Sequence, residues 1–208
     1  MRRKIIESFL DQLFPHPKIP LAHEDAYTLL IATILSAQCS DHRVNQVTKI
    51  LFSEANTPSQ MTSMPITKIE KIIRPCGLYK RKALAIKKTS QILVTQFSSK
   101  VPRSFTSLES LPGVGHKTAS CIMSQSFQQP AFPIDTHIYR CAHRWDISSS
   151  RSIKGVEKDM KSFFLKKNWQ KRHLQIIYYA RKYCPALKHN IQTCFICSAL
   201  QQHSLTSQ

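Results

Sequence analysis

The stretch Leu111-Pro112-Gly113-Val114-Gly115-His116-Lys117-Thr118-Ala119 joins two segments of helical periodicity through a tight turn. Glycine is scarce, with four in 208 residues, so two glycines separated by one residue are a specific feature. Because neither glycine has a Cβ, the backbone can approach another surface closely, and the N–H groups that open the following helix can bind an anion. We therefore predict a hairpin between two helices whose turn binds negatively charged groups.

The net charge indicates which anion to expect. Lys and Arg number 30 against 12 Asp and Glu, which gives +18 at pH 7. Such an excess favours a polyanion, with nucleic acid ahead of an anionic membrane surface. No apolar run reaches the roughly 20 residues that span a bilayer. Glu7 and Asp11 interrupt the apolar stretch behind the basic start, so we expect no export signal, no membrane partner and a cytoplasmic chain bound to DNA phosphates.

Helical periodicity dominates the chain, and the alternation typical of strands is nearly absent. At 42% hydrophobic, 208 residues are enough for one large domain or two small lobes with a buried core. Prolines stand mostly between the periodic segments, where they break few helix hydrogen bonds. We predict an all-α fold with helices near residues 5–13, 27–37, 41–52, 67–74, 81–97, 106–111, 116–127, 136–145, 153–164 and 174–183.

Two residues near the hairpin have side chains suited to chemistry on a sugar. Lys117 falls in the first turn after the hairpin, where its amine could attack a sugar carbon and form a Schiff base; the alternative is a phosphate contact. Asp135 opens a later predicted helix, where its carboxylate could stabilise positive charge on the sugar or cap the helix, and the two roles are compatible. The pair favours an enzyme over a simple binding module.

The seven cysteines fall into two groups. An odd number in a chain without an expected export signal argues against a disulfide framework. Cys39, Cys76, Cys121 and Cys141 lie among apolar or helical residues and are expected to be small buried thiols. The other three, Cys184, Cys194 and Cys197, crowd into the last 25 residues, and this spacing favours a metal site.

The hairpin stretch, followed by Ile134-Asp135-Thr136-His137, resembles the endonuclease III family of helix-hairpin-helix DNA glycosylases. The similarity runs from residues 30–38 through 77–79 to the terminal cysteines. It implies a two-lobed, monomeric all-α protein that binds damaged double-stranded DNA across the cleft between its lobes. Residues 20–129 would form a six-helix barrel carrying the hairpin. Residues 1–19 and 130–208 would form the second lobe with the cysteine loop.

The resemblance also implies an activity. A member of this family is a DNA N-glycosylase that removes oxidised pyrimidines and an abasic-site lyase that cuts 3′ to the site by β-elimination. Lys117 would displace the base and form the imine, and Asp135 would assist that attack and stabilise the charge at the anomeric carbon. Two alternatives are a sister glycosylase for another lesion and a non-catalytic hairpin protein. The lysine argues against the adenine-removing relatives, which lack it.

The same resemblance assigns contacts with DNA. Gln38 would fill the space vacated by the extruded base, and Leu78 would be an apolar wedge between bases. An ordinary helix end and a core leucine are the alternatives for these two positions. The run Lys80-Arg81-Lys82 is most simply a patch that faces phosphates. The other family positions expected to contact DNA are Gly113, Val114, Gly115, His116 and His137.

The cysteine spacing departs from the family pattern. Members often carry Cys-x6-Cys-x2-Cys-x5-Cys around a 4Fe-4S iron–sulfur cluster. Here nine residues lie between Cys184 and Cys194, two lie between Cys194 and Cys197, and the fourth position is His203. We expect an iron–sulfur cluster on these three thiolates with His203 as the fourth ligand, while zinc or a metal-free loop are the alternatives. His189, inside the longer loop, is a second candidate for the fourth ligand.

Overall fold

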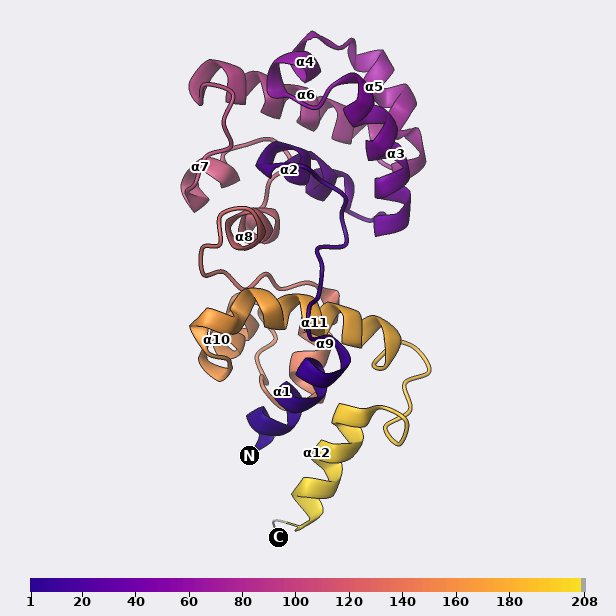
Figure 1. Ribbon diagram of the computed structural model, residues 1–208, viewed down its shortest axis with the longest axis vertical. Helices are drawn as coiled ribbons and strands as arrows, with labels where there is room; N and C mark the ends of the chain where they lie inside the picture. Colours follow the sequence, from indigo (N-terminus) through magenta and orange to yellow (C-terminus); the bar gives the residue numbers. More distant parts are fainter. Residues whose placement is uncertain (207–208) are drawn as a thin grey trace. The chain divides into compact units, whose positions relative to one another are not determined.

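The computed structural model describes residues 1–206, with side chains for residues 1–203, and all regular elements in this range are helical (Figure 1). The predicted all-α fold is therefore confirmed. The chain forms two compact units, one of Ile19–Gln129 and one of Met1–Lys18 with Pro130–Gln208. Among the described helices, none combines the length and apolar character that crossing a bilayer requires.

The unit Ile19–Gln129 is built around one enclosed helix, α2 (Ala26–Leu35). Every residue of α2 from Tyr27 to Leu35 is buried, as expected for a helix that is apolar on all sides. Its start is fixed by a capping box, in which Asp25 Oδ1 accepts a hydrogen bond from Thr28 N–H (2.8 Å). Helices α3 (Asp41–Glu54), α6 (Tyr79–Gln96) and α8 (His116–Gln125) pack on α2. The remaining elements pack on these three and are α4 (Pro58–Ser63), α5 (Ile66–Ile73), the 3₁₀ turn η1 (Arg74–Cys76) and α7 (Phe105–Glu109).

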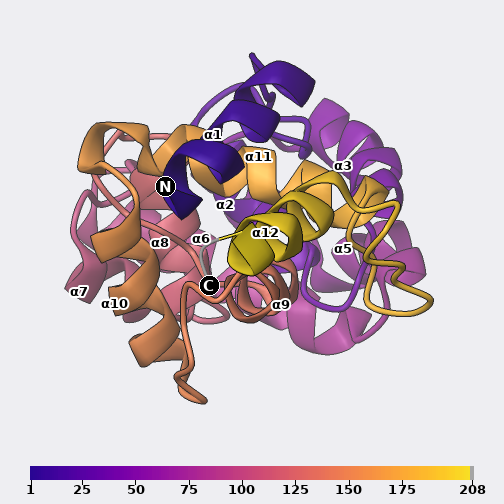
Figure 2. The ribbon, with the colours of Figure 1, turned by 90° about the horizontal axis from the view of Figure 1, so that it is seen from below.

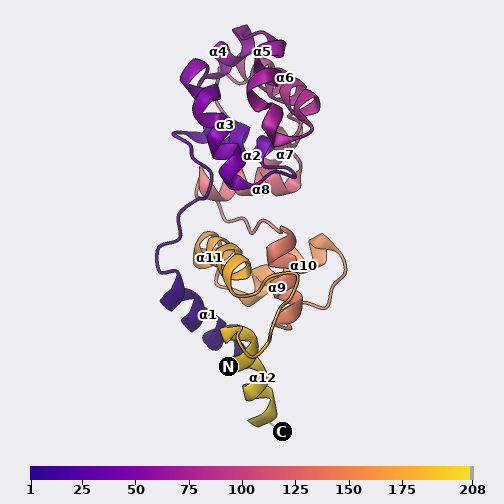
Figure 3. The ribbon, with the colours of Figure 1, turned by 90° about the vertical axis from the view of Figure 1, so that its right-hand side faces the viewer.

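The other unit joins the N-terminal helix to the C-terminal third of the chain. Helix α1 packs on α11 and α12, and α9 packs on α10 and α11; α12 lies beside α1 in Figures 2 and 3. The shared core includes Ile6 and Leu10 of α1 together with Trp145 and Tyr179, all fully buried. The elements are α1 (Arg2–Leu13), α9 (Thr136–Arg144), α10 (Ile153–Phe163), the 3₁₀ turn η2 (Lys166–Asn168), α11 (Trp169–Lys182) and α12 (Phe195–Thr206).

Most helices lie where the periodicity predicts them, with ends shifted by one or two residues. Helix α11 begins at Trp169, earlier than the predicted residue 174. Two helices were not predicted, α4 and α12. The start of α4 does carry a local signal, because Thr57 and Gln60 form a capping box with Pro58 at the first helical position.

A buried arginine fastens α1 to α11. Arg172 is 4% exposed and donates two hydrogen bonds to Asp11, from Nη1 to Oδ1 (2.8 Å) and from Nη2 to Oδ2 (3.0 Å). Gln175 Nε2 donates to the carbonyls of Leu10 (3.0 Å) and Phe14 (2.9 Å). The guanidinium of Arg172 holds the pKa of Asp11 well below its usual range. This network attaches the N-terminal helix to α11 within the same unit.

We predict that Asp11→Asn lowers the free energy of unfolding by about 1–2 kcal/mol near neutral pH, a figure reduced for the partial exposure of Asp11. Folding lowers the pKa of Asp11, so its contribution is complete above the unfolded-state value of about 3.9 and is lost as the pH falls through the lower folded-state value. The difference between wild type and variant should therefore shrink with acidification below that value.

Urea unfolding at about pH 7 and about pH 3 measures this difference. Asp146→Asn is the matched control, because Asp146 forms an exposed ion pair with Arg2 (3.5 Å) and should change stability by less than about 0.5 kcal/mol. Equal stability of Asp11→Asn and wild type at neutral pH would contradict the proposed role of the network.

Candidate functional site

The predicted hairpin is present as α7, a tight turn and α8. Gly113 has φ +80°, in the left-handed region, and a Cβ there would lie 3.0 Å from the Cβ of Ala85 in α6 and 3.5 Å from Cγ2 of Ile34 in α2. Thr89 Oγ1, also from α6, donates a hydrogen bond to the carbonyl of Pro112 (2.9 Å). The turn is thus held against two helices by a close approach that only glycine allows.

The start of α8 has the features of an anion site. Gly115 is the N-cap residue, no side chain caps the helix, and no acidic residue stands in its first turn. Gly115, His116 and Lys117 are exposed, whereas Val114 is buried and anchors the turn. His116 Nδ1 lies 2.7 Å from Glu109 Oε1. The first-turn N–H groups and the positive end of the helix dipole can therefore act on an anion at this surface.

Gln38 and Leu78 share an unusual backbone conformation. Both are left-handed, with φ +53° at Gln38 and +48° at Leu78, and Gly77 precedes Leu78 at φ +64°. This conformation is strained for a leucine, and such residues cluster at functional sites. Leu78 is 51% exposed, so it is not a core leucine, and Gln38 is exposed as well. The accessible side chains of Gln38 and Leu78 therefore lie on two loops of the same unit, Ile19–Gln129.

A buried lysine links these two loops. Lys82 is 5% exposed, and its Nζ donates hydrogen bonds to the carbonyls of Leu35 (2.9 Å) and Cys76 (2.8 Å). Leu35 ends α2 just before Gln38, and Cys76 ends η1 just before Leu78. Burial lowers the pKa of Lys82.

The expectation that Lys80, Arg81 and Lys82 all face phosphates is therefore wrong for Lys82, while Lys80 and Arg81 are exposed. A sequence signal for this existed. Lys82 precedes Ile86 by four positions and so lies on the buried face of α6.

Asp135 is the N-cap residue of α9 in the other unit. Its Oδ1 accepts a hydrogen bond from the N–H of Ile138 (2.7 Å), which confirms the predicted capping role. Capping uses one carboxylate oxygen, so a second role remains compatible with it. Arg140 Nη2 donates to Nδ1 of the half-buried His137 (3.2 Å). Lys117 and Asp135 belong to different units.

Helix α9 also organises the cysteine loop, a role that the sequence did not indicate. Arg140 Nε donates to the carbonyl of Cys184 (3.0 Å). Arg144 Nη1 donates to the carbonyl of Pro185 (2.7 Å) and to Sγ of Cys184 (3.3 Å). Cys184, Cys141, Cys194 and Cys197 are all buried. Hydrogen bonds from the thiols of Cys141, Cys194 and Cys197, and from Arg144, lower the pKa of Cys184.

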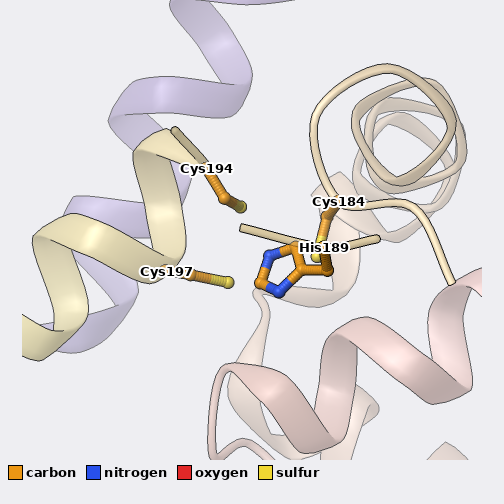
Figure 4. Close-up of side chains that lie close together, drawn as sticks. All are labelled: Cys184, His189, Cys194 and Cys197. Carbon is orange, nitrogen blue, oxygen red and sulfur yellow. The ribbon is translucent and has the colours of Figure 1, made fainter. Parts of the chain in front are cut away.

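Three cysteines and one histidine come together beside α9 (Figure 4). The ligand atoms of Cys184, His189, Cys194 and Cys197 all lie within 4.8 Å of one another, and we call these residues the cysteine–histidine cluster. Such a group could bind a metal. Nε2 of His189 is buried and has no hydrogen-bond partner among the described residues.

The histidine that lies with the three cysteines is His189, the second candidate; His203, the expected fourth ligand, is not part of this group. His203 lies on α12, six positions after Cys197, which is about 9 Å farther along the helix axis and on a different face. Of the other cysteines, Cys76, Cys121 and Cys141 are buried as expected, whereas Cys39 is partly exposed.

Comparison with known proteins identifies relatives over nearly the whole chain. Residues 31–166 match the family model of the HhH-GPD superfamily base excision DNA repair protein. Endonuclease III of Bacillus subtilis (strain 168) is 35% identical over 96% of this chain and 93% of its own length. Endonuclease III of Buchnera aphidicola subsp. Acyrthosiphon pisum (strain APS) is 39% identical over 94% and 93%.

The fold is likewise similar to a solved structure. A trapped covalent intermediate of endonuclease III with DNA, in an estranged-adenine complex, matches with a TM-score of 0.89 and 33% identity. The match covers 98% of this chain and 99% of that chain. The similarity therefore spans both units.

We predict that the two glycines of the hairpin respond differently to alanine. Gly113→Ala combines a left-handed backbone with a Cβ contact at 3.0 Å and should destabilise the protein by about 1–2 kcal/mol. Gly115→Ala has ordinary φ and nothing within 4 Å, so it should lose only about 0.5 kcal/mol through a poorer N-cap. Chemical denaturation compares the pair, and equal losses would show that the close approach at Gly113 is unimportant.

Proposed function

The chain belongs to the endonuclease III family within the HhH-GPD superfamily of base excision DNA repair proteins, and on this premise we propose which residues perform each step. It is a base excision DNA glycosylase and lyase, and its partner is damaged DNA. The observation that carries the proposal is the exposed Lys117 in the first turn of α8, directly after the hairpin.

The hairpin binds the DNA backbone in this proposal. Its exposed turn and the uncapped start of α8 present N–H donors to phosphate oxygens. Contacts of this kind fix the position of the protein on DNA without reading base sequence. The net charge of +18 strengthens binding through the release of counterions. The hairpin residues proposed to bind DNA are Gly113, Val114 (through its main chain), Gly115 and His116, and His137 of the other unit is proposed as a separate DNA contact.

The loops that carry Gln38 and Leu78 extrude the damaged nucleotide. Removing a base from the stack costs a few kcal/mol, and side chains that occupy the gap offset that cost. Leu78 enters between bases as an apolar wedge, and Gln38 fills the space left behind. Both side chains are accessible, and buried Lys82 fixes the two loops to each other, so they can act as one rigid device.

Lys117 and Asp135 perform the chemistry. The Lys117 amine attacks the anomeric carbon, and the base leaves with the electron pair of the glycosidic bond. The Asp135 carboxylate assists the attack and stabilises the positive charge that develops on the sugar. Loss of the amine proton and opening of the sugar ring give an imine. Removal of a proton from the adjacent carbon then expels the 3′ phosphate, and water hydrolyses the imine to release the enzyme.

The substrates we propose are oxidised pyrimidines, in line with the family. A sister activity on another lesion would use the same lysine and would appear as a different ranking of damaged bases in a cleavage panel. A purely DNA-binding protein would form no imine at all, so trapping with borohydride separates that alternative from both enzymes.

The four-thiolate set that binds the family's 4Fe-4S cluster is not present among the converging residues of this chain. The cysteine–histidine cluster supplies three thiolates and an imidazole in place of four thiolates. No step of the proposed reaction passes through this site, because the attack and the charge stabilisation are assigned to Lys117 and Asp135 alone.

We predict that Lys117→Gln abolishes borohydride-trapped enzyme–DNA adducts and strand cleavage, because an amide cannot form an imine. DNA binding should persist to within a few-fold, since the hairpin donors are main-chain groups and one cation among 30 is lost. Gel-based trapping on an abasic site and a binding titration measure the two effects.

The control for Lys117→Gln is Lys154→Gln, which removes the same charge from an exposed position of α10. It should trap and cleave like the wild type. Wild-type trapping by Lys117→Gln would overturn the assignment and make Lys117 a phosphate contact.

We predict a different pattern for Asp135→Asn. The amide oxygen can still cap α9, so stability should be retained, whereas the charge that stabilises the sugar cation is lost. Base removal should fall by roughly 100-fold or more, while trapping on a pre-formed abasic site should fall much less. Single-turnover rates on the two substrates measure this split, and equal losses on both would argue against the role given to Asp135.

A further inference from the structure

The cysteine–histidine cluster offers three thiolates and one imidazole, whereas the family's iron–sulfur cluster is bound by four thiolates. We propose that Cys184, His189, Cys194 and Cys197 bind one tetrahedral zinc ion per chain in place of a four-iron cluster. The inference concerns the metal site alone and is independent of the roles given to Lys117 and Asp135.

The spacing of the ligand atoms favours a single ion. They all lie within 4.8 Å of one another. A tetrahedral zinc with bonds of about 2.0–2.3 Å holds its ligand atoms about 3.5–3.8 Å apart, so small adjustments bring the four into place. A cluster of four iron and four sulfide atoms must lie between its thiolates and would require them farther apart. The four residues already converge on a volume suited to one ion.

His189 gives the second argument. Its Nε2 is a buried nitrogen without a hydrogen-bond partner among the described residues, and such a nitrogen is costly to leave unmatched. Neutral imidazole together with thiolates is a common ligand set for structural zinc. The longer loop between Cys184 and Cys194 places this histidine, and the Asn190 carbonyl then accepts a hydrogen bond from Cys194 N–H (3.1 Å), which turns the chain back to the cluster.

The groups around the ligands complete the site. Arg144 Nη1 donates to Cys184 Sγ (3.3 Å). The Tyr179 hydroxyl accepts from Ile196 N–H (2.8 Å), which directs its own proton toward Cys194 Sγ at 3.3 Å. Hydrogen bonds of this kind orient thiolate ligands and balance their charge. A pocket of about 420 Å³ lined by His189 and Cys197 gives the ion a path to the site.

One rival arrangement would restore four thiolates. Cys141 of α9 is fully buried, and its thiol is hydrogen-bonded to Cys184. A set made of Cys141, Cys184, Cys194 and Cys197 could in principle hold an iron–sulfur cluster. Cys141 is not among the four mutually close donors, however, so we assign it to packing beneath the site.

The test is the metal content of the full-length protein, expressed with both iron and zinc in the medium and purified without oxygen. We expect about one zinc per chain, no acid-labile sulfide and no iron–sulfur absorption in the visible spectrum. Iron in any stoichiometry, with or without sulfide, would overturn the proposal, and so would a protein that binds no zinc when titrated with the metal alone. These readouts do not depend on glycosylase activity.

Four variants identify the ligands. His189→Ala should weaken zinc binding at least tenfold in competition with a chromophoric chelator, and His189→Cys should restore it, because four thiolates also bind zinc. Cys141→Ala and His203→Ala, the matched controls, should bind zinc like the wild type. Unchanged affinity of His189→Ala, or a tenfold loss in Cys141→Ala with its helical circular dichroism retained, would overturn the ligand assignment.

Discussion

The missing side chain at Gly113 lets the hairpin turn lie directly against α2 and α6, and much of the surface that we propose for DNA binding depends on this approach. The same two helices border the loops of Gln38 and Leu78, since α2 ends just before the first and α6 begins just after the second. Lys82 then joins the loops through two buried carbonyls. One packed scaffold therefore holds the hairpin turn proposed to bind phosphate and the two strained side chains in fixed relation, as the proposed base extrusion requires.

In the other unit, α9 is the element that positions both the proposed catalytic carboxylate and the cysteine loop. It begins at Asp135, whose carboxylate caps it, and ends at Arg144, whose guanidinium holds the segment after Cys184. Arg140 adds a hydrogen bond to the Cys184 carbonyl. The cysteine loop is thus attached to the helix that carries the proposed catalytic carboxylate. A metal in the loop would help to keep that helix in place.

The sequence predicted those features that depend on local patterns. Helical periodicity located most helices, and the glycine pair located the hairpin. The sequence offered both His203 and His189 as the fourth ligand but could not rank them, because counting from Cys197 reaches His203 while only the folded loop shows that His189 lies beside the three cysteines. Helix α12 itself has no clear amphipathic period and is fixed by contact with α1. The burial of Lys82 was missed because its neighbours Lys80 and Arg81 indicate a charged surface patch, although its spacing from Ile86 places it on the buried face of α6.

The two sites place different demands on their residues. Imine formation needs a primary amine at one point, and no neighbouring side chain can replace Lys117 there. A structural ion needs only four nitrogen or sulfur donors that converge, and a loop of different length can supply one of them from a different position. His189 within the lengthened loop lies beside the three cysteines and is the replacement that we propose. In our proposal, the departure of this chain from the spacing of its family therefore replaces an iron–sulfur cluster with a single zinc ion, while the chemistry assigned to the hairpin lysine is unaffected.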